Sequence, residues 1–135
     1  MKPFLYVLDK DKKPVPAADQ VNVAKLLADV DGRRVGLSKV LVGKWIANVS
    51  TVFTALDCNS QLKGQPILFE TEIILKGHKE FVRYTSWTEA QTGHKKIVDL
   101  LQNRVWVTEA LVKAGIGSIE HEEAAREILS AVVYS

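Results

Sequence analysis

Hydrophobic and polar residues alternate with a period of two through the middle of the chain, from about residue 35 to residue 87. Such alternation is typical of strands that bury one face and expose the other. Within residues 67–75 the odd-numbered positions are apolar or threonine, whereas Glu70 and Glu72 lie on the opposite side. The pattern predicts four strands, at residues 38–47, 49–56, 67–75 and 80–87.

The connections predict an antiparallel meander. We expect a tight turn at Asn48, a longer loop over residues 57–66, and a glycine-containing hairpin at residues 76–79. Residues 4–8 form a further β-prone run, followed by a polar turn at residues 9–13.

Apolar residues recur at helical spacing in three other parts of the chain. Asp19 is placed to cap a helix that ends near Gly32. A second helix is expected over residues 88–101, opened by a capping box at residues 88–91. The end of the chain predicts a short helix at residues 108–114 and a last amphipathic helix that opens at Ser118. The apolar stripe of the second helix consists of Trp87, Ala90, His94, Ile97 and Leu101.

These elements predict an α+β fold with a single domain over residues 1–135. We expect an antiparallel sheet of four to five strands, helices packed on one face, and a C-terminal helical segment. The sheet-and-helix unit spans about residues 38–101. Residues 104–135 are rich in valine, leucine and isoleucine, and they either pack on their own domain or form a helical arm that binds a second copy.

The composition is that of one soluble globular domain, with 135 residues, 47% of them hydrophobic and 25% charged. No apolar run approaches the roughly 20 residues of a membrane span, and the N-terminus lacks the apolar stretch of a signal peptide, so we expect a cytoplasmic protein. The single cysteine, Cys58, excludes an intrachain disulfide and a multi-cysteine zinc site.

The net charge is +2, which is far from the basic character of a dedicated nucleic-acid-binding protein. The charge is unevenly distributed. Residues 1–67 hold ten Lys or Arg and six Asp, and residues 68–135 hold eight Lys or Arg and ten Asp or Glu, so the two halves carry +4 and −2. Such asymmetry can orient subunits in an assembly.

The sequence carries no recognisable catalytic, metal-binding or phosphate-binding motif. The three histidines, His78, His94 and His121, are not spaced as a metal pair, and the glycines form neither a dinucleotide-binding nor a Walker loop. We therefore predict a protein that is not an enzyme and that holds no metal and no cofactor.

His94 is nevertheless the best-placed titratable group, because it lies on the apolar stripe of its helix. We expect a structural histidine bonded to a strand residue, with a catalytic base as the alternative. Glu70 and Glu72 project from one sheet face about 7 Å apart. They are interpreted as part of a solvated face with Arg83 and Lys44. The candidates for ligand binding are Lys44, Thr51, Asp57, Glu70, Arg83, Tyr84 and His94.

Three segments carry an ordered pattern: VSTVFTALD at residues 49–57, PILFET at residues 66–71, and RYTSWTEA at residues 83–90, followed by Gly93-His94. In order and spacing they resemble a family of small, uncharacterised phage and prophage proteins that share the pattern VSTVFLGLDH, LLFETM and RYxTxxEAxxGH. The resemblance covers about residues 40–100. Cys58 stands where the family has a histidine, which removes a possible partner of His94.

The resemblance implies a phage-encoded accessory protein and no particular activity. We therefore expect a non-enzymatic, homo-oligomeric binding protein in the host cytoplasm. It would bind a host protein or sequester a small anionic or nucleotide ligand, without nucleic-acid or membrane partners. The alternatives are a small hydrolase that uses His94 with Glu70 or Asp57, and a virion head or tail accessory protein.

Overall fold

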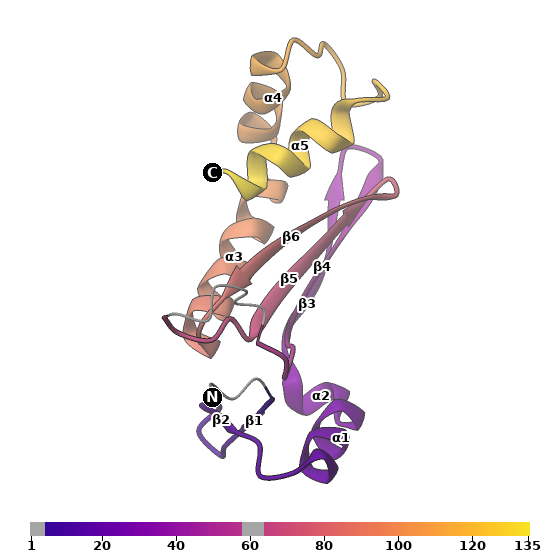
Figure 1. Cartoon of the computed structure of the whole chain (residues 1–135). Helices are drawn as coiled ribbons and strands as arrows, with labels where there is room; N and C mark the ends of the chain where they lie inside the picture. The colour runs from indigo at the N-terminus through magenta and orange to yellow at the C-terminus, as the bar shows by residue number, and fades with distance from the viewer. Residues whose placement is uncertain (1–4, 58–63) are drawn as a thin grey trace.

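The computed structural model describes residues 5–57 and 64–135, and in them the chain forms a two-stranded sheet, a four-stranded sheet and five helices (Figure 1). The predicted α+β fold with an antiparallel sheet is confirmed. Cys58 and the interior of the expected 57–66 loop lie outside the described residues. In chain order the elements are β1 (Tyr6–Leu8), β2 (Pro14–Pro16), α1 (Gln20–Ala28), α2 (Val30–Arg33), β3 (Arg34–Val42), β4 (Trp45–Phe53), β5 (Phe69–Leu75), β6 (His78–Tyr84), α3 (Trp87–Gln102), α4 (Arg104–Lys113) and α5 (Ala124–Val133).

The four-stranded sheet has the order β3-β4-β5-β6, and each neighbouring pair is antiparallel. Gly43 and Lys44 join the first two strands, and Lys76 and Gly77 join the last two. Gly43 has a φ of 61°, which suits the first position of a type II′ turn. Both two-residue turns lie at the same end of the sheet (Figure 1).

The predicted turn at Asn48 is wrong. Asn48 lies inside β4, where it pairs with Lys39 and Ile74. An asparagine is tolerated at this position because its side of the sheet carries no helix. The sequence therefore placed the turn between the first two strands five residues too late in the chain, because the turn in the structure begins at Gly43.

The main core lies between the sheet and the C-terminal half of the chain. Along β5 the buried residues alternate with half-buried ones, as the sequence predicts for a sheet with one covered face. α3 runs along this face, and α5 lies across it near the two hairpin turns (Figure 1). Five residues of α5 are buried against the sheet and α3: Ala124, Ala125, Ile128, Leu129 and Val132.

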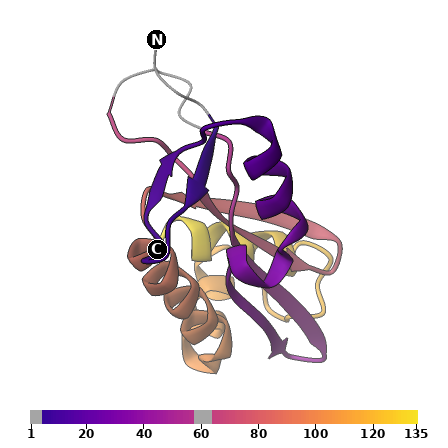
Figure 2. The ribbon, with the colours of Figure 1, turned by 90° about the horizontal axis from the view of Figure 1, so that it is seen from below.

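A second core lies at the other end of the sheet, where the N-terminal unit of β1, β2, α1 and α2 packs (Figure 2). The ring of Phe69 contacts Phe53 at 5.3 Å between centroids and meets Trp87 edge-on at 6.2 Å. The backbone N–H of Tyr6 donates to the carbonyl of Ala55 at 2.9 Å, which fastens β1 to the end of β4. The sequence missed β2, because its proline-rich run was interpreted as a connector.

The helix ends follow local capping rules. Asp19 caps α1 as predicted, but the helix ends at Ala28, because Asp29 opens a separate α2. In α3 the cap is Ser86, whose hydroxyl accepts from the N–H of Glu89 at 3.1 Å, so the capping box lies two residues before the predicted one.

The C-terminal helices also differ in their bounds. α4 already begins at Arg104, because the Asn103 side chain caps it, and the last helix begins at Ala124 rather than at Ser118. The apolar side of α5 is occupied within the chain, so any contact of residues 104–135 with a second copy would use other sides. Among the described residues, no helix is both long and apolar enough to span a membrane.

Candidate functional site

A hydrogen-bonded network joins α3 to all four strands of the main sheet, with His94 at its centre. One hydroxyl comes from each strand: Ser38, Thr51, Thr71 and Tyr84. The imidazole Nε2 lies 2.9 Å from the Ser38 hydroxyl, and Nδ1 lies 2.7 Å from that of Thr51. The Thr51 and Thr71 hydroxyls are 2.5 Å apart, and Thr71 and Tyr84 are 3.0 Å apart. The network therefore crosses the whole width of the sheet.

Two glycines make room for the aromatic rings of the network. A Cβ atom on Gly36 would lie 2.8 to 2.9 Å from the imidazole of His94, and a Cβ atom on Gly93 would overlap the ring of Tyr84. Real Cβ atoms do not approach neighbours so closely, because interiors are close-packed. Glycine at these two positions lets β3 and α3 come close to the two rings.

Burial sets the charge state of the network. Thr51 and Thr71 are fully buried, and burial lowers the pKa of His94 from its ordinary value of 6.5. Burial also raises the pKa of Tyr84, against a smaller opposite effect of its hydrogen bond with Thr71. A neutral imidazole has one donor and one acceptor nitrogen, so it fits between two hydroxyl groups. The partners of His94 are hydroxyls, and the arrangement is typical of a structural histidine.

This network predicts a pH dependence of folding. Because the pKa of His94 is lowered by folding, the unfolded chain binds a proton first, and stability should fall as the pH falls below about 6.5. Urea unfolding at about pH 7.5 and about pH 5.5 measures this loss. His94→Gln should lose less stability over that interval than the wild type. Equal losses in the two proteins would show that His94 does not titrate in this way.

The other sequence candidates lie away from the network. Glu70 accepts from Nε of Arg83 at 3.0 Å, on the sheet face opposite to Thr71 and His94. Lys44, in the β3–β4 turn, pairs with Glu120 at 3.1 Å. The structure therefore brings Thr51, Tyr84 and His94 together, and it separates Lys44, Glu70 and Arg83 from them.

Asp57 joins the two ends of its loop, since its carboxylate accepts from the N–H of Ile67 at 2.9 Å. The catalytic alternative paired His94 with Glu70 or Asp57. Glu70 faces away from His94, and the Asp57 carboxylate is engaged by the backbone. Within residues 5–57 and 64–135, no three His, Cys, Asp or Glu side chains are grouped to hold a metal ion.

Sequence reasoning missed Ser38 and Thr71 as members of the network. Thr71 carried a signal, because it lies among apolar residues on the buried side of β5. A buried hydroxyl needs a partner, so a threonine on an apolar face predicts a polar contact. Ser38 had no such signal, since its place opposite His94 depends on how α3 lies on the sheet.

The opposite side of the main sheet, called the open face here, exposes large apolar side chains. Leu41 and Ile46 are cross-strand partners and are 69% and 55% exposed, while Leu37 and Phe81 are 56% and 41% exposed. The half-buried Ile74 lies between them. The open face consists of Leu37, Lys39, Leu41, Ile46, Asn48, Ser50, Val52, Glu70, Glu72, Ile74, Lys79, Phe81 and Arg83.

Exposed apolar side chains gathered on one face mark interaction surfaces more often than scattered ones do. The charges on the open face are of both signs. Arg83 and Glu70 pair with each other, whereas Glu72, Lys39 and Lys79 have no ion-pair partner among the described residues. Lys39 and Lys79 lie one row nearer the hairpin turns than Glu72. The open face therefore mixes exposed apolar side chains with polar ones, and the row of its unpaired acid lies next to the row of its two unpaired bases.

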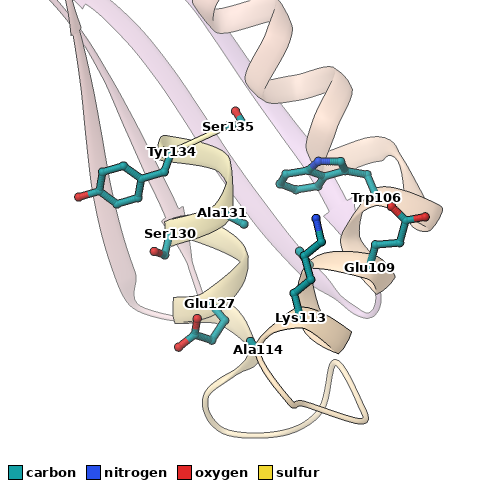
Figure 3. Close-up of a pocket in the computed structure, with 10 residues that line it drawn as sticks. Trp106, Glu109, Lys113, Ala114, Glu127, Ser130, Ala131, Tyr134 and Ser135 are labelled. Atoms are coloured by element: carbon teal, nitrogen blue, oxygen red, sulfur yellow. The ribbon is translucent and has the colours of Figure 1, made fainter.

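A groove between α4 and α5 has a volume of about 440 Å³. Figure 3 shows Trp106 and Lys113 extending from α4 beside it, while the ring of Tyr134 points away. Its lining also includes Glu109 and Glu127, so both charge signs are present. This groove contains none of the candidates from the sequence.

Comparisons of the chain with protein-family models, with curated proteins and with solved structures found no match. Among the surfaces of the described residues, the open face is the strongest candidate for an interaction.

Proposed function

We propose that the chain is a non-catalytic binding protein that self-associates through the open face of its sheet. The observation that carries the proposal is the exposure of Leu37, Leu41, Ile46 and Phe81 on one sheet surface. Removing apolar area from water contributes about 25 cal/mol per Å² before the entropy cost of association is subtracted, so these side chains favour a partner that covers them. A host-directed role as a phage accessory protein is part of the proposal and rests on the sequence resemblance.

The charges of the open face support a second copy as the partner. A two-fold symmetric contact requires a surface that complements itself. If two open faces stack about an axis that runs across the strands, the turn end of one lies over the opposite end of the other. With the axis between the row of Glu72 and the row of Lys79, Glu72 on β5 of each copy comes toward Lys79 on the neighbouring strand β6 of its mate. A net charge of only +2 adds little repulsion between copies.

The placement of His94 supports a role without catalysis. Its two ring nitrogens are both engaged by hydroxyl groups, and Glu70 faces the other side of the sheet. A general base has to reach the proton that it removes. In this arrangement His94 holds α3 on the sheet.

Light scattering on variants of the open face tests the proposal. Leu37→Glu and Ile46→Glu each place a charge within the proposed contact, where an unpaired buried charge is strongly unfavourable. Each should weaken self-association by at least about tenfold, which corresponds to about 1.4 kcal/mol. Circular dichroism should show both variants folded, because the two residues lie outside the cores.

Val105→Glu is the matched control. Val105 lies on α4, outside the open face, and is 67% exposed. This variant should associate like the wild type. If it dissociates to the same extent as Leu37→Glu, the effect is one of added charge and the open face is not the contact surface.

A further inference from the structure

A second cavity lies between the turn end of β3 and α4, away from the network of His94. Its volume is about 430 Å³, within the range of small-molecule sites. We call it the β3–α4 cavity. Five apolar residues that line it are at most 8% exposed: Val42, Leu101, Val107, Leu111 and Ile116. Leu41 and Val112 are largely exposed and also belong to the lining. The cavity therefore offers an apolar floor with an apolar rim.

The polar groups of this cavity are few. Arg104 is the single charged residue of the lining, beside the uncharged Gln102, Thr108 and Ser118. Within residues 5–57 and 64–135, Arg104 has neither an ion pair nor a side-chain hydrogen bond. An exposed guanidinium beside an apolar cavity is complementary to an anionic group that is attached to an apolar body.

We propose that the β3–α4 cavity binds a free medium-chain fatty acid, with the acyl chain on the apolar floor and the carboxylate at Arg104. Each buried methylene contributes about 0.8 kcal/mol, so a chain fills such a floor favourably. At roughly 30 Å³ per group, the share of one water molecule in the liquid, the volume of about 430 Å³ accommodates up to about fourteen carbons. Among the described residues that line the cavity, Arg104 is the one cation, which matches one carboxylate.

Binding at this site can be measured separately from the proposed self-association. The β3–α4 cavity and the open face share Leu41 alone, and the variants below leave that residue unchanged. The proposal of fatty-acid binding can therefore fail or hold whatever the oligomeric state proves to be.

Calorimetric titration of the full chain with decanoate tests the site. We expect saturable binding of one decanoate per chain. Arg104→Gln should weaken it by about tenfold or more, as expected when a charged hydrogen bond is lost. In the wild type, the uncharged decanol should bind about tenfold more weakly than decanoate, and Arg104→Gln should remove that preference.

A second variant blocks the cavity itself. Thr108 is exposed and lines the cavity, so Thr108→Trp fills space in it without replacing any residue of the buried floor. Decanoate binding should be lost in this variant. The matched controls are Val105→Trp, which adds the same ring elsewhere on α4, and Lys113→Gln, which removes another cation of α4. Both should bind decanoate like the wild type.

Several results would overturn the proposal. One is the absence of saturable decanoate binding up to about 1 mM, a concentration that corresponds to a binding free energy of only about −4 kcal/mol. Another is an unchanged affinity for decanoate in both Arg104→Gln and Thr108→Trp. Binding only to phospholipid vesicles, without binding of free decanoate, would also contradict it, since it would indicate a membrane surface as the partner. If Thr108→Trp fails to fold, the comparison of Arg104→Gln with Lys113→Gln still decides.

Discussion

Replacing Leu129 by alanine should lower the free energy of unfolding by about 3 kcal/mol, within the range of about 2 to 5 kcal/mol for buried leucines. Leu129 is fully buried in α5 and belongs to the same core as the main sheet. The substitution removes apolar contacts and leaves a cavity between α5 and its neighbours. For a chain of this size the midpoint of thermal unfolding should fall by about 10 °C.

Urea unfolding followed by circular dichroism measures the effect, at one fixed protein concentration, because self-association adds to apparent stability. Val105→Ala is the control, since Val105 is exposed on α4 and should change stability by less than about 0.5 kcal/mol. A wild-type unfolding curve for Leu129→Ala, combined with altered assembly, would mean that α5 serves contacts between copies instead of the core.

The second large effect is expected at the centre of the His94 network. Thr51→Val keeps the shape of the side chain but removes the hydroxyl that contacts both Thr71 and His94. Leaving buried polar atoms without partners costs about 1 to 3 kcal/mol. We expect a loss of about 2 to 3 kcal/mol in the free energy of unfolding, measured by urea denaturation.

A double variant separates the network from simple packing. Thr51→Val combined with Thr71→Val removes two hydroxyls that bond to each other, so the double loss should be smaller than the sum of the single losses. Thr92→Val, on the exposed side of α3, serves as the control and should be close to neutral. Strict additivity of the two single variants would argue against coupling through the network.

Much of the fold was predictable because its signals are local. The alternation of residues in β5, the cap at Asp19 and the apolar stripe of α3 each depend on neighbours within a few positions, and each agrees with the structure. The exact residues at which the helices begin and end depend less on local sequence. Ser86 rather than Thr88 caps α3. Both residues have a hydroxyl group that could cap the helix, and the position at which β6 ends decides which of them does so.

The turn between β3 and β4 shows why other features escaped prediction. Asn48 is a good turn residue, and nothing local excludes a turn there. The turn forms at Gly43 because pairing of β3 with β4 around this residue aligns Val40 with Ala47 on the covered face of the sheet. Such a register depends on helices that come more than forty residues later in the sequence.

The candidate site was predictable only in part for the same reason. His94, Thr51 and Tyr84 were identified individually, but their meeting depends on the order of the strands and on the path of α3. The open face was partly anticipated as a solvated surface through Glu70 and Arg83. Its apolar character was not anticipated, because the first two strands were divided at the wrong residue. That error assigned Leu41 and Ile46 to a single strand.

Sedimentation velocity of the wild-type chain over a range of concentrations tests self-association most directly. The predicted result is a species that grows from the 15.0 kDa chain toward twice that mass as the concentration rises through the micromolar range. A single 15.0 kDa species at every concentration up to about 100 µM would contradict the assignment of the open face as a contact between copies.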